Sequence, residues 1–226
     1  MAKLILTTVG TSIIENYLSR PENSPERRFF DQEIEGKKAN QECNKEIIGF
    51  TDMIKKFVAK NYNTEIDRPS TETKSLSAEI ISLHIMQKND LIDSNDIIVL
   101  LYSDTLEGKL ASDINKKILS EKSGFNNVEE QNLKGVKGRD AASFTEAVNS
   151  RSITRVLNNI IARISPDDCY INFSGGYKGL IPVISEFARS RENRIDMYCL
   201  FEKSNSLIKY KYNPQGEYNI DEIASR

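Results

Sequence analysis

The sequence predicts an α/β fold, with a Rossmann-like parallel sheet, crossover helices and a C-terminal strand pair. Residues 96–102 form a continuous apolar run, which is typical of a strand covered on both faces. Along the chain, such runs alternate with segments in which apolar residues recur at helical spacing. This alternation favours parallel strands joined by helices.

In the first half of the chain we expect strands at 3–9 and 96–102, and helices from Ile13, at 45–60, at 77–86 and at 111–119. The helix at 45–60 would turn one apolar face to the core, formed by Ile47, Ile48, Met53, Ile54, Phe57 and Val58. Residues 20–41 are charged and show no convincing period, so they predict an excursion on the surface.

In the second half we expect strands at 128–133 and 169–173, a basic loop at 134–140, helices at 143–164 and 177–188, and a strand pair at 195–201 and 206–212. A polar turn at 203–205 would join the final pair. No repeat, low-complexity tract or linker is visible, so residues 1–226 are expected to form a single domain.

Composition and charge restrict the classes of partner. The chain has 226 residues and a formal net charge of -2, with no run of Lys and Arg, so we expect no binding to DNA or long RNA. The longest apolar run, 97–102, is far shorter than the ~20 residues that span a bilayer. No secretory signal opens the chain, and a cytoplasmic protein without membrane contact is expected.

The cysteines indicate neither a metal site nor a disulfide framework. Cys43, Cys169 and Cys199 are odd in number and share no CxxC spacing, and His84 is the only histidine. His84 sits among apolar residues and is better explained as a helix-face residue than as a catalyst. We therefore expect free thiols, no metal and no cofactor.

Small and polar residues follow each of the three strongest strands. They are Gly10-Thr11-Ser12, Ser103-Asp104-Thr105 and Ser174-Gly175-Gly176-Tyr177-Lys178. Parallel strands bring such turns to one edge of the sheet, where open α/β folds bind ligands. Helix N-termini there favour anions, and Lys178, expected one turn into its helix, adds a full positive charge. The predicted ligand is an anion, most simply a phosphate.

Each of these turns also has a purely structural interpretation. Ser12 and Glu15 have the spacing of a capping box, and for 103–105 we favour a helix cap over a ligand site. Gly175 and Gly176 could serve close packing alone, and Tyr177 could either stack on a base or pack in the fold. Lys178 is harder to explain structurally, because a cation near a helix N-terminus is unfavourable unless an anion is present.

Familiar phosphate and nucleophile fingerprints are absent from the sequence. Lys178 is followed by Gly179 and does not fit a P-loop, and no G-x-G-x-x-G opens the first crossover. Ser12 is not part of a G-x-S-x-G elbow, and there is no second histidine for a catalytic triad.

Three segments together resemble the CARF domain family, the CRISPR-associated Rossmann-like sensors of cyclic oligoadenylates: 8–14 (TVGTSII), 103–108 (SDTLEG) and 172–178 (NFSGGYK). The likeness runs in order through Phe201 and Glu202, and its nearest branch is that of the stand-alone ring nucleases of type III CRISPR systems. The family usually has Thr at position 174 and often Phe at position 177. Ser174 and Tyr177 keep the hydroxyl and the aromatic ring.

The resemblance implies a homodimer that binds cyclic tetra-adenylate across its interface, because a ring with two-fold symmetry matches an isologous dimer. It implies catalytic roles for Ser12 and Lys178. The ligand-binding residues that it implies are Gly10, Thr11, Asn16, Ser103, Asp104, Thr105, Ser174, Gly175, Gly176 and Tyr177.

The implied reaction is metal-independent attack of a ribose 2′-OH on its adjacent phosphate, giving linear oligoadenylates with 2′,3′-cyclic phosphate ends. Lys178 would stabilise the developing charge and Ser12 would hold the in-line geometry. No general base is apparent, so slow turnover is expected.

Two other functions remain open at this point. One is a non-cleaving CARF sensor that controls a fused or separate effector; we rank it second because a CARF-like domain fills nearly all of the 226 residues. The other is an unrelated Rossmann-like phosphohydrolase, which would need a metal site for which no carboxylate cluster is evident.

Overall fold

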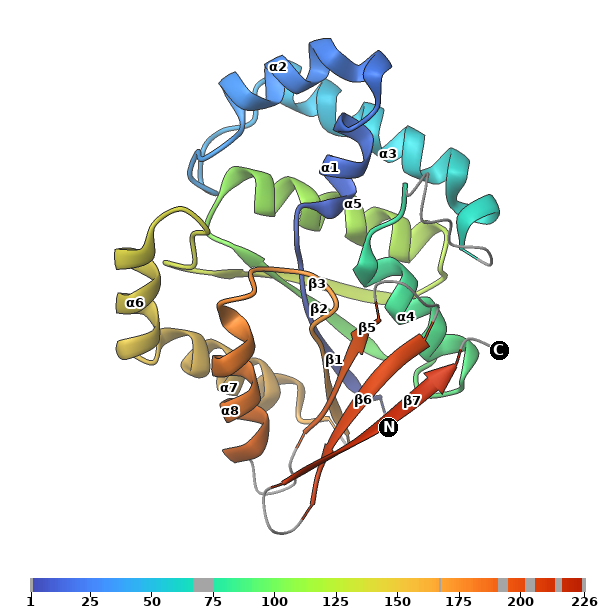
Figure 1. Cartoon of the computed structure of the whole chain (residues 1–226), viewed down its shortest axis with the longest axis vertical. Coiled ribbons are helices and arrows are strands. Elements are labelled where there is room, and N and C mark those ends of the chain that lie inside the picture. Colours follow the sequence, from blue (N-terminus) through green and yellow to red (C-terminus); the bar gives the residue numbers. More distant parts are fainter. Residues whose placement is uncertain are drawn as a thin grey trace.

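The chain folds around one seven-stranded sheet, as a computed structural model describes for residues 2–66, 75–166, 168–190, 195–201, 206–213 and 217–224 (Figure 1). The strand order is β3-β2-β1-β4-β5-β6-β7. The strands are β1 (Leu4–Thr8), β2 (Ile97–Ser103), β3 (Asn127–Leu133), β4 (Cys169–Asn172), β5 (Asp196–Leu200), β6 (Ser206–Tyr212) and β7 (Tyr218–Ala224). The five strands β3, β2, β1, β4 and β5 are parallel to one another, whereas β6 pairs antiparallel with β5 and with β7. The predicted Rossmann-like α/β class is confirmed.

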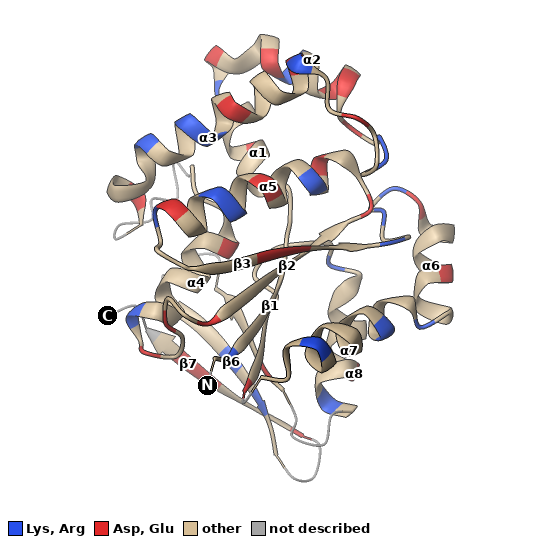
Figure 2. Ribbon diagram, turned by 180° about the vertical axis from the view of Figure 1, so that it is seen from behind, with Lys and Arg blue, Asp and Glu red and all other residues tan. Residues whose placement is uncertain are grey.

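The helices that connect the strands are α1 (Ser12–Leu18), α2 (Ser24–Glu33), α3 (Lys45–Glu65), α4 (Ala78–Lys88), α5 (Leu106–Glu121), α6 (Ala141–Asn149), α7 (Ser152–Ile164) and α8 (Leu180–Ser190), with a 3₁₀ turn η1 at Pro21–Asn23. They cover both faces of the sheet. Charges of both signs are interspersed along α2, α3 and α5 (Figure 2).

The central strands are apolar because each of their faces lies against a hydrophobic core. All five residues of β1 are buried. Ile5 packs into a core formed with α1 to α5, while Leu4 and Leu6 pack into a second core formed with α6, α7 and α8. A strand buried on both faces has no polar alternation, which is why its apolar run is visible in the sequence.

The segment 20–41 is more ordered than the sequence indicates. It contains η1 and α2, and its Phe30 and Ile34 are buried. The Phe30 ring lies 6.2 Å from the Phe50 ring of α3, measured between centroids. The helical pattern of α2 is not visible in the sequence, because the segment is mostly charged and very few of its apolar side chains contact the core.

Several predicted boundaries differ from the structure. The helix expected at 143–164 is two helices, because Arg151 between them has a φ of 56°. Ala147 and Ile153 on either side of this break face the same core, so the apolar spacing does not reveal it. Ile48 and Met53, expected on the buried face of α3, are exposed by 50% and 42%.

The C-terminal end also differs from expectation. The predicted pair is present as β5 and β6, but β7 adds a further strand at the sheet edge. Tyr218 and Ile220 of β7 are each exposed by 57%. An edge strand this exposed does not show the alternation of apolar and polar residues by which a half-buried strand is recognised in a sequence. The polar turn predicted at 203–205 lies outside the described residues.

Stability is expected to fall between pH 4 and pH 6 through Asp113 of α5. Burial and the neighbouring Glu130 carboxylate raise the pKa of Asp113 from 3.8 to about 6. Because the folded state then binds the proton more tightly than the unfolded state, this group's contribution is full below pH 3.8 and is lost as the pH rises through about 6. In denaturant unfolding, Asp113→Asn should not show this fall in the free energy of unfolding. At pH 7 the variant should therefore be more stable than wild type. The same substitution at exposed Asp221 is the control, and equal pH profiles for Asp113→Asn and wild type would contradict the prediction.

Candidate ligand-binding site

The turns after β1 and β4 touch each other at the carboxyl edge of the sheet. A Cβ placed on Gly10 would lie 2.8 Å from the Gly176 nitrogen, and one on Gly176 would lie 2.9 Å from the Thr8 Cβ. Gly176 also has a φ of 94°, which side-chain-bearing residues rarely adopt. The Thr8 hydroxyl donates a 2.5 Å hydrogen bond to the Gly175 carbonyl. Packing this close requires glycine, so the structural interpretation of these residues holds whether or not they also bind a ligand.

A pocket of about 820 Å³ opens above these turns, within the usual ~300–1,000 Å³ of ligand sites. All three predicted turns contribute to its lining, through Gly10, Thr11, Ser103, Asp104, Thr105, Gly176, Tyr177 and Lys178. Two further walls come from residues 35–38, after α2, and from 137–140, before α6. Sequence reasoning assigned no role to these two segments, because only the folded chain brings them to the strand ends.

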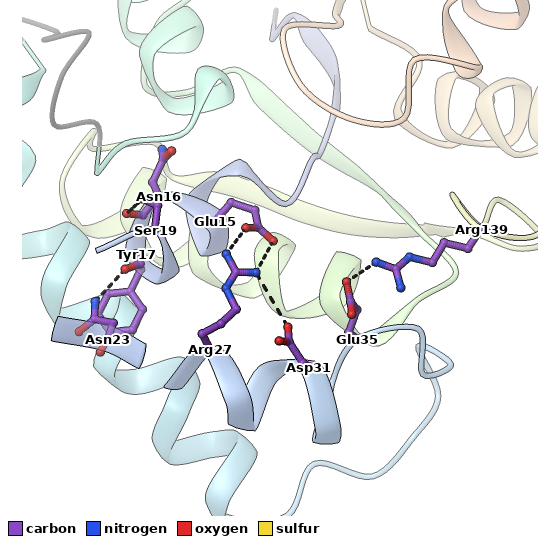
Figure 3. Close-up of polar contacts among 9 residues, drawn as sticks. All are labelled: Glu15, Asn16, Tyr17, Ser19, Asn23, Arg27, Asp31, Glu35 and Arg139. Carbon is purple, nitrogen blue, oxygen red and sulfur yellow. Dashed lines mark hydrogen bonds and ion pairs between the residues drawn. The ribbon is translucent and has the colours of Figure 1, made fainter. Parts of the chain in front are cut away.

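The two outer walls are joined by an ion pair between Arg139 and Glu35 (Figure 3). α2 is in turn tied to α1, since the Arg27 guanidinium lies 2.6 Å from the Glu15 carboxylate and the Asn23 amide donates to the Tyr17 carbonyl at 2.7 Å (Figure 3). These contacts hold the segment 20–41 beside the strand ends, where it forms part of the pocket.

Five basic side chains line the pocket: Lys37, Lys38, Lys137, Arg139 and Lys178. Three of them are paired, with Glu33 at 3.0 Å from Lys37, Asp140 at 3.6 Å from Lys137, and Glu35 on Arg139. Within the described part of the chain, Lys38 and Lys178 have no ion-pair partner. The lining also contains five carboxylates, those of Glu15, Glu35, Asp104, Glu107 and Asp140, so the formal charges of the pocket balance, and Lys38 and Lys178 are its two cations without a direct ion pair among the described residues.

Lys178 precedes its helix instead of lying one turn inside it. α8 begins at Leu180, because the Gly-rich turn continues through Gly179, so the predicted start at 177 is wrong. Lys178 is nevertheless at the positive end of α8 and exposed, which remains an unfavourable place for a cation without an anion. Its neighbour Tyr177 meets the Phe144 ring of α6 edge-on, at 5.1 Å and 83°, and stays 36% exposed.

The hydroxyls of Thr105 and Ser174 are engaged in the fold. Thr105 caps α5 by accepting a 3.2 Å hydrogen bond from the Gly108 N–H, so the capping interpretation is confirmed for this turn. The Asp104 carboxylate accepts from the Gly135 N–H at 3.2 Å and so holds the loop 134–140. Ser174 donates to the Asn172 amide oxygen at 2.6 Å and accepts from the Leu200 N–H at 2.8 Å.

Ser12 and Asn16 lie on α1 beside the pocket but are not among its lining residues. The capping interpretation of Ser12 is wrong, since the cap position of α1 is Thr11 and no side chain bonds the first turn. The Ser12 Oγ is buried and has no hydrogen-bond partner among the residues that the structure describes. The Asn16 amide donates to the Leu76 carbonyl at 3.0 Å.

Replacing Ser12 with alanine should therefore leave the free energy of unfolding within about 0.5 kcal/mol of wild type, because no hydrogen bond is lost. A capping serine would instead cost about 1 kcal/mol. Urea unfolding measures the difference, and Thr105→Ala, which removes a real cap, is the matched control. A loss as large as that of the control would contradict this prediction.

Glu79 is a site-adjacent residue that sequence reasoning missed. It lies in the first turn of α4, is fully buried, and accepts a hydrogen bond from the Gly10 N–H at 2.5 Å. Burial raises the pKa of its carboxyl. Ser77 and Ser82, also fully buried, bond the Asn115 amide of α5 at 2.6 Å and the Asn172 amide of β4 at 2.8 Å. The sequence does contain a signal for this burial: α4 has apolar residues on all sides, and a helix of that kind is buried together with its few polar residues.

Within the described ranges, His, Cys, Asp and Glu form no cluster of three or more that could hold a metal ion. In the same residues, no helix has both the length and the apolar character needed to cross a bilayer.

Comparison with known proteins gives the family. A family model described as CRISPR-associated protein (Cas_APE2256) matches residues 74–210, which is more than half of the chain and includes the turns after β2 and β4. No curated protein matches the chain. On the family match, the chain belongs to this family of CRISPR-associated proteins.

Proposed function

We propose that this protein binds a cyclic oligoadenylate, most simply cyclic tetra-adenylate, and slowly cleaves it to switch off type III CRISPR signalling. The observation that carries the proposal is Lys178, which has no ion-pair partner among the described residues, lies two residues before α8 and lines the 820 Å³ pocket. A cation in the pocket wall favours a phosphate there, and the positive end of the α8 dipole, close by in the chain, adds to this preference. Membership of a CRISPR-associated family supports a nucleotide signal of that system as the source of the phosphates.

The ligand would lie across a homodimer interface, with each protomer contributing the same contacts to half of the ring. Exposed apolar side chains beside the pocket support such an interface. Tyr177 and Ile181 line a smaller hollow with Leu200, and Phe201 follows Leu200 with 57% of its surface exposed. Apolar residues exposed together at one edge are typical of a contact surface.

In the proposed reaction a ribose 2′-OH of the ligand attacks the adjacent phosphorus, and the bond to the 5′-oxygen of the next nucleotide breaks. The 2′-OH proton leaves to solvent and the departing 5′-oxygen gains one. Lys178 stabilises the extra negative charge of the phosphorane and of the leaving oxygen. The proposal assigns no described residue as general base, so turnover is slow, since such help contributes ~10²–10⁴ in rate.

A second candidate function is a sensor that binds the ring without cleaving it. The observation that favours it is the burial of the Ser12 Oγ away from the pocket lining, because this hydroxyl then does not meet the ligand. A shift of α1 on ligand binding would be needed to bring Ser12 into the reaction.

Incubation with labelled cyclic tetra-adenylate in EDTA separates these functions. Linear products with 2′,3′-cyclic phosphate ends support the ring nuclease, and tight binding without conversion supports the sensor. Cyclic hexa-adenylate tests ring size, and linear tetra-adenylate is the control for general affinity for oligoadenylate. Failure to bind any cyclic oligoadenylate would rule out both functions.

A further inference from the structure

The carboxyl group of Glu79 contacts both of the glycine turns at the floor of the pocket. Its Oε1 accepts the hydrogen bond from the Gly10 N–H at 2.5 Å, after β1. On the other side, a Cβ built on Gly175 would lie only 2.1 Å from the same oxygen. Glu79 itself is not among the pocket-lining residues, so it lies beneath the turns and not in the binding surface.

Among the described residues, no cation forms an ion pair with this carboxyl. The groups that lower its pKa are its own backbone N–H, the Gly10 N–H and the Ser77 hydroxyl, and none of these is a cation. Within the described residues its Oε2 has no hydrogen-bond partner. Burying an ionised carboxylate without a cation is costly, so the neutral acid is favoured. Its pKa is accordingly raised, with desolvation as the main cause.

The strands packed against α4 carry ionisable groups that interact with one another. Lys209 of β6 lies 2.8 Å from Asp196 of β5, and the Tyr170 ring of β4 packs on the Tyr198 ring of β5. α5 meets this part of α4 through the uncharged Asn115 amide. On the pocket side of the turns, the charged residue nearest to Gly176 along the chain is the exposed Lys178.

We propose that Glu79 is a positioning residue of the ligand site, which holds the turn after β1 against the turn after β4 as a neutral acid. In this state it accepts from the Gly10 N–H without placing a negative charge beneath the turns that would hold the ligand's phosphates. The proposal rests on the proposed function in so far as the ligand is anionic.

The affinity of the site for an anion should therefore depend on pH. Ionisation of Glu79 puts a negative charge under Gly10 and Gly175, which repels the phosphates, so the protonated protein binds the ligand more tightly. Affinity then falls as the pH rises toward the raised pKa of Glu79. Glutamine keeps the acceptor for Gly10 and cannot ionise, so Glu79→Gln should remove this fall.

Titration of the 2′-deoxy analogue of cyclic tetra-adenylate from pH 5 to pH 8.5, at constant ionic strength, tests this. The analogue lacks the attacking 2′-OH, so cleavage is prevented in every variant while Lys178 is retained. The protein with Glu79 should lose affinity as the pH rises, while Glu79→Gln keeps its low-pH affinity throughout. Asp113→Asn, which removes a carboxyl with a raised pKa outside the pocket, should follow the wild-type profile. Identical profiles for Glu79 and Glu79→Gln would overturn the proposal.

A ligand-free measurement separates this proposal from the proposed function. Hydrogen exchange of the Gly10 amide should be slow in wild type and in Glu79→Gln, and at least about tenfold faster in Glu79→Ala, where the acceptor is lost. If no variant binds cyclic tetra-adenylate, the proposed function fails and the exchange result still decides the role of Glu79. Unchanged protection of Gly10 in Glu79→Ala would overturn the positioning role.

Discussion

Replacing Lys178 with alanine is expected to abolish cleavage of cyclic tetra-adenylate and to weaken its binding by about tenfold or more, without loss of stability. A preorganised group that stabilises transition-state charge is typically worth ~10²–10³ in rate. Lys178 is exposed, has no ion-pair partner among the described residues, and lies at the positive end of α8. Its removal should therefore leave the free energy of unfolding equal or slightly higher.

Single-turnover cleavage, equilibrium binding and denaturant unfolding measure these three quantities. Lys178→Arg keeps the charge and should retain most of the affinity, while Lys56→Ala, at an exposed position of α3, is the control for a general loss of charge. Cleavage by Lys178→Ala at the wild-type rate would contradict the role of Lys178 on which the proposed function rests. A variant that fails to fold would instead show that the lysine has a structural role.

Replacing Gly176 with alanine is expected to destabilise the protein by about 3 kcal/mol and to abolish ligand binding. The new Cβ meets the Thr8 Cβ at 2.9 Å, and the φ of 94° adds backbone strain. The turn must then move away from Thr8 and Gly10, and the pocket floor moves with it.

Gly124→Ala is the matched control for this substitution. Gly124 has a φ of 76° but nothing within 4 Å of its added Cβ, so the change there measures the backbone strain alone, about 1 kcal/mol. The difference between the two variants in urea unfolding is the contribution of the close approach. Equal losses would show that the approach of the two turns is not a constraint on the site.

The strand ends could be located from the sequence because the two-sided burial of β1 and β2 makes them apolar throughout. Parallel topology then places their turns at one edge, and the structure bears this out for Gly10, Ser103 and Gly176. The positions of Glu79 and of residues 35–38 could not be predicted. Their nearness to these turns depends on how α2 and α4 pack, and no local pattern in the chain encodes that distance.

The ionisation of Glu79 and the start of α8 show two other limits. A glutamate in a helix is usually solvated, and only its complete burial changes the pKa of this one. Tyr177 and Lys178 fit a helical pattern with the residues after them, but close packing of Gly175 and Gly176 against Glu79 and Thr8 delays the helix to Leu180. In both cases tertiary contacts override the local preference.

The floor and the walls of the pocket differ in how readily they accept substitutions. The floor, where backbones approach within contact distance at Gly10 and Gly176, admits almost no substitution. The walls at 35–38 and 137–140 are connecting segments on the surface, which tolerate insertion and replacement. Under the proposed function, exchange of the walls would change which ring is accepted, while the same floor would hold the phosphates.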